Sequence, residues 1–379
     1  MTTQRRGTPD FLLLFLTFAL VGFGTVMVFS ASYNLNPDPL YYTKRQIIWA
    51  ALGTFVMFFF MNVNYRRLKK WFLPFFLLVV ALLILVLIFG VRVNGAKSWF
   101  GIGSFGGQPT EFAKVAVILY LSALISKKGE TIREFKKGLL PPLIIVGFVA
   151  GLIMLQPDLG SCMILVLSAM TVIIAGGAKF RHLALLGFAG AMLLGLYLLV
   201  LLLPSESSAA ASYRIERFTA YLHPWEHQLD SGFHIVQSLF AFGHGGITGA
   251  GFGQSIQKLF YLPAAHNDFI FSIIGEELGF IGATLFLLVY LLFIWRGLIV
   301  AVRCQDTFGT LVGTGFISMI GLQALINIGG VTNAIPITGV TLPFISFGGS
   351  SLMATMMAMG ILLSISRDMN RPDKEKRSA

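Results

Sequence analysis

Long apolar runs separated by short polar stretches dominate the chain. Ten of them approach the roughly 20 residues that a helix needs to cross about 30 Å of hydrocarbon. They predict membrane helices at residues 11–31, 46–63, 71–90, 109–126, 139–156, 159–177, 182–203, 267–295, 308–328 and 346–366. The first run is too long for a signal-peptide core, and we interpret it as a retained helix. The pattern predicts an all-α polytopic membrane protein, with residues 1–379 forming one membrane domain.

The longest polar stretch, residues 204–266, lies between the seventh and eighth predicted helices and forms one large outer loop. Within it, "GFHIVQSLFAFG" (Gly232–Gly243) places its apolar residues at helical spacing. We expect this segment to lie on the membrane surface or to pack back on the helices.

Lys and Arg residues are distributed unevenly between the two sides of this arrangement. With a cytoplasmic N-terminus, twenty of the 28 lie in cytoplasmic segments, seven lie in outer segments, and Lys114 lies inside the fourth helix. Cytoplasmic segments of membrane proteins collect Lys and Arg. We therefore expect both termini to be cytoplasmic. The net charge of +11 is explained in the same way, so we expect no nucleic-acid partner.

Ionisable residues at the membrane are few, and those with functional potential gather near the outer boundary. Glu111 and Lys114 in "QPTEFAKVAV" share a helical face, Asp158 lies in "QPDLG", and Asp268 lies in "HNDFIF". Such groups are costly and tend to be functional, so they predict a polar cavity that opens outward. Each also has a structural interpretation: Glu111–Lys114 as a buried ion pair, and Asp158 and Asp268 as helix caps.

Metal and nucleotide motifs are weak. His223 and His227 in "HPWEH" have a zinc-like spacing, but a proline lies between them and no third ligand is evident. The glycines of "GITGAGFGQS" follow no strand, which excludes a dinucleotide fingerprint.

Several blocks in a fixed order resemble the SEDS family of bacterial cell-wall polymerases, which includes FtsW, SpoVE and RodA. These blocks are "QPTEFAK", "QPDLG", "YRIERFTAYLHPW", "GFGQSIQKLFYLP", "HNDFIFSIIGEELGFIG" and "IPITGVTLPFISFGGSS". The resemblance runs from about Pro9 to Arg367, and the FtsW/SpoVE branch is the closer match. The chain departs from the family pattern at Ala264, Asn267 and Phe347.

The resemblance implies a ten-helix peptidoglycan glycosyltransferase that acts on lipid II at the outer face of the bacterial cytoplasmic membrane. It implies that Asp268 is catalytic and that Glu111, Lys114 and Asp158 are functionally important. It also implies a class B penicillin-binding protein as transpeptidase partner, within a division or elongation complex. The choice between division, sporulation and elongation stays open.

One carboxylate is enough for this chemistry. The leaving group, undecaprenyl pyrophosphate, is already a stable anion and needs positive charge rather than a proton. Asp268 then has only to act as general base. Candidates to hold the pyrophosphate are Lys97, Arg214, Arg217 and Lys258, with Lys114 deeper. A divalent cation, Mg²⁺ or Mn²⁺, stays open because no ligand cluster specifies one.

A lipid II flippase or another transporter is the alternative, with Glu111–Lys114 as a gate. Transporters place their binding site near the midplane of the bilayer, whereas these acids lie near the outer boundary. A noncatalytic scaffold for a partner enzyme is a third interpretation.

Overall fold

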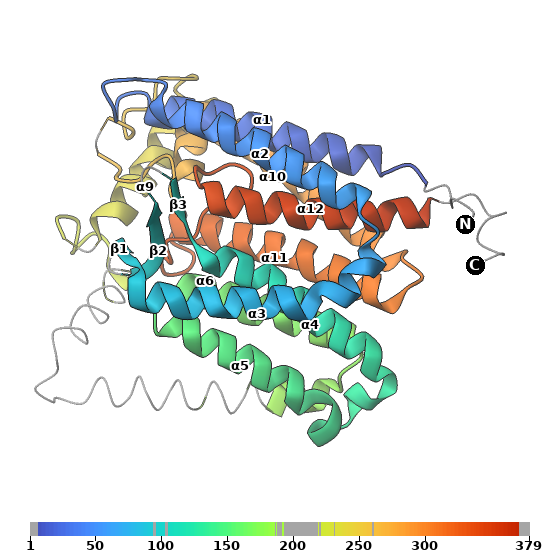
Figure 1. Ribbon diagram of the computed structural model, residues 1–379. Helices are drawn as coiled ribbons and strands as arrows, with labels where there is room; N and C mark the ends of the chain where they lie inside the picture. Colours follow the sequence, from blue (N-terminus) through green and yellow to red (C-terminus); the bar gives the residue numbers. More distant parts are fainter. Residues whose placement is uncertain are drawn as a thin grey trace, which may run out of the picture.

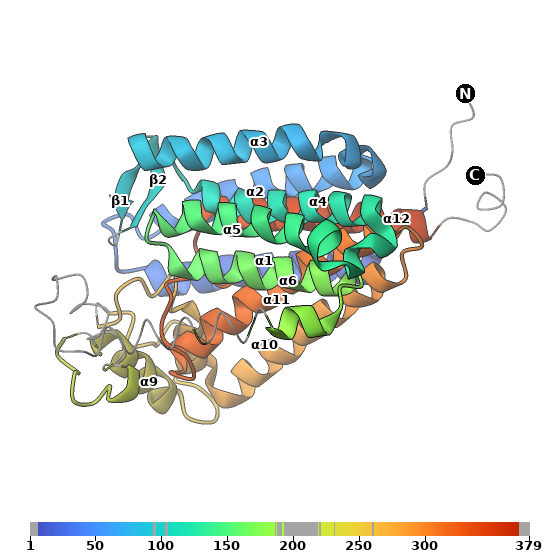
Figure 2. The same cartoon turned by 90° about the horizontal axis from the view of Figure 1, so that it is seen from below.

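The computed structural model describes residues 7–93, 96–102, 105–185, 187, 192, 219, 221–230, 232–259 and 261–370. These residues form a bundle of long helices with a small sheet at one end (Figures 1 and 2). The long helices are α1 (Phe11–Ser32), α2 (Tyr41–Asn62), α3 (Tyr65–Phe89), α4 (Pro109–Lys128), α5 (Leu140–Met154), α6 (Leu159–Ala175), α10 (Ile270–Val302), α11 (Thr307–Val331) and α12 (Gly349–Met369). Two short helical turns, η1 (Gly129–Arg133) and η2 (Phe135–Leu139), connect α4 to α5.

The predicted polytopic helical fold is confirmed. Within the described residues, eight helices are long and apolar enough to cross a membrane, and α6 is a shorter apolar helix. The predicted helix over residues 182–203 lies mostly outside the described residues. In the predicted outer loop, the expected helix is present as α9 (Phe233–Gly245).

Several helices extend beyond the apolar runs that predicted them. Helix α3 begins at Tyr65 instead of residue 71, because the Asn64 side chain caps it and accepts from the Arg66 backbone N–H at 3.0 Å. Helix α10 likewise continues to Val302 instead of residue 295. Hydropathy marks the part of a helix within hydrocarbon, whereas capping marks where the helix begins.

A small three-stranded antiparallel sheet adds to the predicted helical fold. It consists of β1 (Val91–Val93), β2 (Ala96–Ile102) and β3 (Phe105–Gly107), in the order β1–β2–β3. Val91 pairs with Trp99, and Phe100 pairs with Gly107. The sequence carried a hairpin signal, the Asn-Gly dipeptide at positions 94 and 95, that an apolar-run analysis does not detect.

Helix α12 forms the centre of the bundle, and nearly all of its residues are buried. Small residues allow it to approach its neighbours closely, as in other membrane helix pairs. A Cβ atom on Gly360 would lie 2.4 Å from the Met57 carbonyl oxygen of α2. In contrast, α2, α3 and α10 expose Phe55, Leu77, Ile88 and Leu288, as lipid-facing helices do.

Both described ends of the chain lie at the end of the bundle away from the sheet (Figure 1). The Gly7 N–H donates to the Arg367 carbonyl at 3.1 Å, and the Arg296 guanidinium contacts the Asp10 carboxylate at 2.6 Å. The two ends therefore lie on the same side of the membrane, as the Lys and Arg distribution predicts.

Helix α10 is interrupted at Gly279, whose φ of 66° lies in the left-handed region. The preceding loop binds the interrupted backbone: the N–H groups of Ala250 and Gly251 donate to the carbonyls of Glu276 and Glu277 at 2.9 and 3.0 Å. Irregular backbone at membrane depth is tolerated where protein satisfies its polar groups, as this loop does.

We predict that Gly279→Ala destabilises the protein by about 1–3 kcal/mol through backbone strain alone. The added Cβ would also lie 2.2 Å from the Gly249 backbone nitrogen. The measurement is the apparent melting temperature in detergent. Gly147→Ala is the matched control, because no described atom lies within 4 Å of the added Cβ in α5. Equal melting temperatures for the two variants would contradict the argument.

Candidate active site

Asp268 lies in the turn immediately before α10 and is half-buried. It is not the cap of α10, because Phe269 occupies that position and makes no side-chain cap bond. The Asp268 carboxylate instead faces the glycine turn between α11 and α12, where a Cβ on Gly339 would lie 3.6 Å from Oδ2. The cap interpretation of Asp268 is therefore wrong, and its carboxylate is available for chemistry.

The environment of Asp268 changes its acidity. Burial, and to a smaller extent the nearby Asp158 carboxylate, together raise the pKa of Asp268 to about 6. A carboxylate with this pKa is mostly ionised at neutral pH and is a stronger base than an ordinary aspartate.

Asp158 is a helix cap. Its Oδ1 accepts from the Ser161 backbone N–H at 3.0 Å at the start of α6, and its Oδ2 accepts from Gln108 Nε2 at 3.0 Å. The capping interpretation is confirmed. Because both oxygens are engaged, Asp158 acts on Asp268 through its charge.

The predicted ion pair between Glu111 and Lys114 is present in α4. Lys114 Nζ contacts Glu111 Oε1 at 2.9 Å, and only 1% of the lysine side chain is exposed. The same ammonium donates to Gln323 Oε1 of α11 at 2.9 Å. The pair therefore joins α4 to α11, and the three side chains that make these contacts are all buried.

Gln323 extends this network to the turn that faces Asp268. Its Nε2 donates to the Thr341 carbonyl at 3.1 Å and contacts Ser351 Oγ at 3.3 Å. One turn further along α11, Asn327 Nδ2 donates to the backbone carbonyls of Asp268 and Val340, each at 2.7 Å. The two amides connect Lys114 to the backbone of Asp268.

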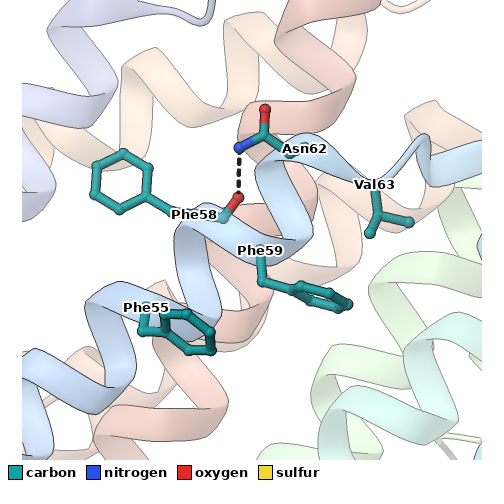
Figure 3. Close-up of a pocket in the computed structure, with 5 residues that line it drawn as sticks. All are labelled: Phe55, Phe58, Phe59, Asn62 and Val63. Atoms are coloured by element: carbon teal, nitrogen blue, oxygen red, sulfur yellow. Dashed lines mark hydrogen bonds between the residues drawn. The ribbon is translucent and has the colours of Figure 1, made fainter.

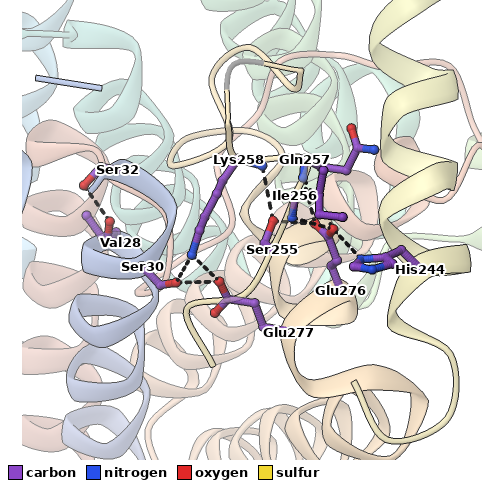
Figure 4. Close-up of polar contacts among 10 residues, drawn as sticks. All are labelled: Val28, Ser30, Ser32, His244, Ser255, Ile256, Gln257, Lys258, Glu276 and Glu277. Atoms are coloured by element: carbon purple, nitrogen blue, oxygen red, sulfur yellow. Dashed lines mark hydrogen bonds and ion pairs between the residues drawn. The ribbon is translucent and has the colours of Figure 1, made fainter. Parts of the chain in front are cut away.

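Lys258 occupies a second buried network (Figure 4). Its Nζ contacts Glu277 Oε1 at 2.8 Å and Ser30 Oγ at 3.1 Å, and the carboxylate has no exposed surface. The adjacent Glu276 accepts from the Ile256 N–H at 2.9 Å and contacts His244 Nδ1 at the same distance. These contacts give Lys258 a structural role, in which it joins the loop before α10 to α1 and α10.

The other predicted pyrophosphate ligands are Lys97, Arg214 and Arg217. Lys97 lies in β2 and donates to the Ile88 carbonyl at 2.9 Å. Arg214 and Arg217 lie outside the described residues. Among residues that the structure describes, no group of three or more His, Cys, Asp or Glu could hold a metal ion.

A shallow apolar hollow is present on the surface of α2, away from these groups (Figure 3). It is lined by Phe55, Phe58, Phe59, Asn62 and Val63, at the end of α2 that lies toward the chain termini in Figure 1. The hollow includes none of the candidate site residues.

Comparison with known proteins decides the family. The model of the FtsW/RodA/SpoVE cell cycle proteins matches residues 11–371. The chain belongs to the FtsW/RodA/SpoVE family. It is 46% identical to the stage V sporulation protein E of Bacillus subtilis (strain 168), with 96% of this chain and 99% of that protein covered. It is 40% identical to the probable peptidoglycan glycosyltransferase FtsW of Geobacter metallireducens, with 95% of each covered.

A solved structure gives the same result. A chain of a peptidoglycan synthase complex, studied for its coordination of polymerization and crosslinking, superposes with a TM-score of 0.80. The two chains are 30% identical, with 96% of this chain and 99% of that chain covered. The predicted family and its polytopic membrane fold are thereby confirmed.

Sequence reasoning missed Gln323 and Asn327, which in this FtsW/RodA/SpoVE protein join the candidate site residues. The signal was present, because two amides four residues apart share one face of an otherwise apolar helix. Polar side chains inside membrane helices usually face the protein interior. The sequence does not reveal which groups they contact, because their partners come from other parts of the chain.

We predict that Lys114→Met destabilises the protein by about 3–5 kcal/mol, because it leaves the buried Glu111 carboxylate unpaired. The double variant Glu111→Gln/Lys114→Met should recover most of this loss. Apparent melting temperature in detergent measures both effects.

Arg133→Met is the matched control, since its pair with Glu130 has the same spacing but is 59% and 83% exposed. An exposed pair contributes only about 0–1 kcal/mol. If Lys114→Met melts with the control, the Glu111–Lys114 pair does not have the stabilising role assigned to it.

Proposed function

We propose that this chain is a peptidoglycan glycosyltransferase that polymerises lipid II into glycan strands at the outer face of the bacterial cytoplasmic membrane. Its family and the glycosyltransferase name of its relative FtsW support the general activity. One observation carries the assignment of the reactive group: the Asp268 carboxylate is half-buried, caps no helix, and has a pKa raised to about 6.

In the proposed reaction, the Asp268 carboxylate removes the proton from the 4-hydroxyl of the acceptor GlcNAc. The hydroxyl oxygen attacks C1 of the donor MurNAc, and the anomeric centre is inverted. The bond between C1 and the pyrophosphate oxygen breaks, and the electron pair leaves with undecaprenyl pyrophosphate. The proton stays on Asp268 until solvent removes it. Because the leaving group needs no proton, the second carboxyl group of a glycosidase is not required.

The leaving pyrophosphate requires positive charge. Lys114 and Lys258 each contact a buried carboxylate, so these two lysines contribute little net charge. Among the predicted cations this leaves Lys97, Arg214 and Arg217 as the proposed pyrophosphate ligands. The divalent cation, Mg²⁺ or Mn²⁺, stays open in this proposal, because such a cation needs only one or two protein carboxylates beside the phosphates of the substrate.

The partner follows from the same relatives. The similar solved chain belongs to a synthase complex that combines polymerization with crosslinking. We propose that this chain likewise acts with a class B penicillin-binding protein that crosslinks the new strands, together with other proteins of a division or elongation complex.

We predict that Asp268→Asn lowers glycan synthesis from purified lipid II by about 10²–10⁴-fold, the usual contribution of a general base. The assay uses the full chain with its transpeptidase partner, whose crosslinking site is disabled. Asp306→Asn, at the cap of α11, is the control, because Asn also caps helices well. Normal polymer from Asp268→Asn would falsify the mechanism. Lipid II transport across vesicles without polymer would instead establish the flippase.

We predict that turnover at saturating lipid II rises with pH through about 6 and then levels, because only ionised Asp268 accepts a proton. Asp158→Asn keeps the cap of α6 but removes the neighbouring negative charge. It should lower the pKa of Asp268 and move the acidic limb to lower pH. Initial rates at a series of pH values measure the limb. A limb that moves to higher pH, or stays in place, would contradict the electrostatic coupling.

A further inference from the structure

Two buried amides of α11 hold the backbone on both sides of the Asp268 carboxylate. Asn327 is 4% exposed, and its Nδ2 donates to the carbonyl of Asp268 and to that of Val340, each at 2.7 Å. Val340 directly follows Gly339, against which the Asp268 carboxylate lies. One side-chain nitrogen therefore fixes the separation between the carboxylate's own turn and the turn that it faces.

Gln323 holds the same glycine turn from one helical turn away. It is 2% exposed, and its Nε2 donates to the Thr341 carbonyl at 3.1 Å. Its Oε1 accepts from Lys114 Nζ at 2.9 Å. The amide group has a donor end and an acceptor end, so it can join a cation to a carbonyl, which no carboxylate or ammonium can do alone.

We propose that Asn327 and Gln323 are positioning residues for the reaction. Asn327 fixes the position of the Asp268 carboxylate. Gln323 links the glycine turn beside that carboxylate to the Glu111–Lys114 pair. This inference rests on the proposed role of Asp268 as general base. It gives a physical route for the importance that the family resemblance implies for the buried Glu111 and Lys114: they act through Gln323 and the turn at Thr341.

The alternative is a purely structural role, in which the amides only stabilise the packing of α11 against its neighbours. The two interpretations differ in what they change. A positioning role changes turnover and the pH dependence of the base, and leaves the affinity for lipid II nearly intact. A structural role changes thermal stability, with little effect on the turnover of the molecules that remain folded.

The test compares Asn327→Ala and Asn327→Asp with the wild type, using the full chain and its transpeptidase partner. Asn327→Ala should lower kcat about 10²-fold, as a displaced catalytic group does, while KM for lipid II changes by less than about threefold. Asn327→Asp is isosteric, but an ionised carboxylate has no donor for the carbonyl oxygens of Asp268 and Val340, and a protonated one can bind only one of them. It should therefore also lower kcat, by at least about 10-fold, with KM retained.

Asn333→Asp is the matched control for the added charge. It makes the same substitution just past the end of α11, where the Asn333 amide contacts the Tyr221 carbonyl at 3.4 Å. We expect its kcat to stay at the wild-type value. Gln323→Glu is a second variant that keeps an acceptor for Lys114 but loses the donor to Thr341. It should lower kcat about 10-fold with KM retained.

The outcomes separate the two proposals. If Asp268→Asn is inactive while Asn327→Ala and Gln323→Glu turn over as the wild type does, the positioning role is overturned and the base assignment stands. If Asn327→Ala does not fold, an unchanged kcat in Asn327→Asp overturns the inference by itself. If Asp268→Asn is fully active, the proposed base is wrong, and the loss expected in the Asn327 variants has no basis.

Discussion

An ammonium group enclosed within a helical bundle must be neutralised and must have its hydrogen bonds satisfied. Lys114 is 1% exposed, and its charge is met by Glu111 on its own helix and by Gln323 on α11. The unpaired ion would cost several kcal/mol in such surroundings, so the three side chains are fixed together. The Nε2 group of Gln323 donates to the Thr341 carbonyl, so the same amide also fixes the turn at Thr341. The geometry around Asp268 depends on this enclosed charge.

The acids of this chain share one chemistry and differ in their surroundings. Glu111 and Glu277 contact lysines, and Asp158 accepts two hydrogen bonds as a helix cap. Each of these contacts occupies a carboxylate oxygen that a substrate would need. Asp268 has its backbone carbonyl bound, and burial raises the pKa of its side chain. Different surroundings of similar groups are how active sites assign separate roles to carboxylates.

The sequence predicted the membrane helices well, because an apolar run near 20 residues has few other uses. Even the helix that begins with Pro141 and Pro142 is present, since proline is tolerated in the first turn. The small sheet and the capped start of α3 were missed, because a hairpin and a cap are local signals that hydropathy does not register.

The candidate site could be predicted only in part. Glu111 and Lys114 lie three residues apart on one helix, so local spacing was enough to predict their pair. Lys258 contacts Glu277 and Ser30 from distant parts of the chain, and no local pattern indicates that contact. The same limit applies to Asn327, whose two acceptors come from separate loops. Spacing predicts contacts within a helix, whereas contacts between elements require the fold.

The interruption of α10 and the loop bound to it help to fix the position of Asp268. Lys258 and the loop before it are attached to α10 through Glu276 and Glu277, and the chain then returns to the start of the same helix through Asp268. This segment is therefore a short loop that is bound to α10 and then continues into the start of the same helix. Closing a short loop costs little conformational entropy. Just before the break at Gly279, the carbonyls of Glu276 and Glu277 hold Ala250 and Gly251 of the preceding loop in place. A single carboxylate can serve as the base only if its position is fixed, and the closed loop together with the α11 amides fixes it from two directions.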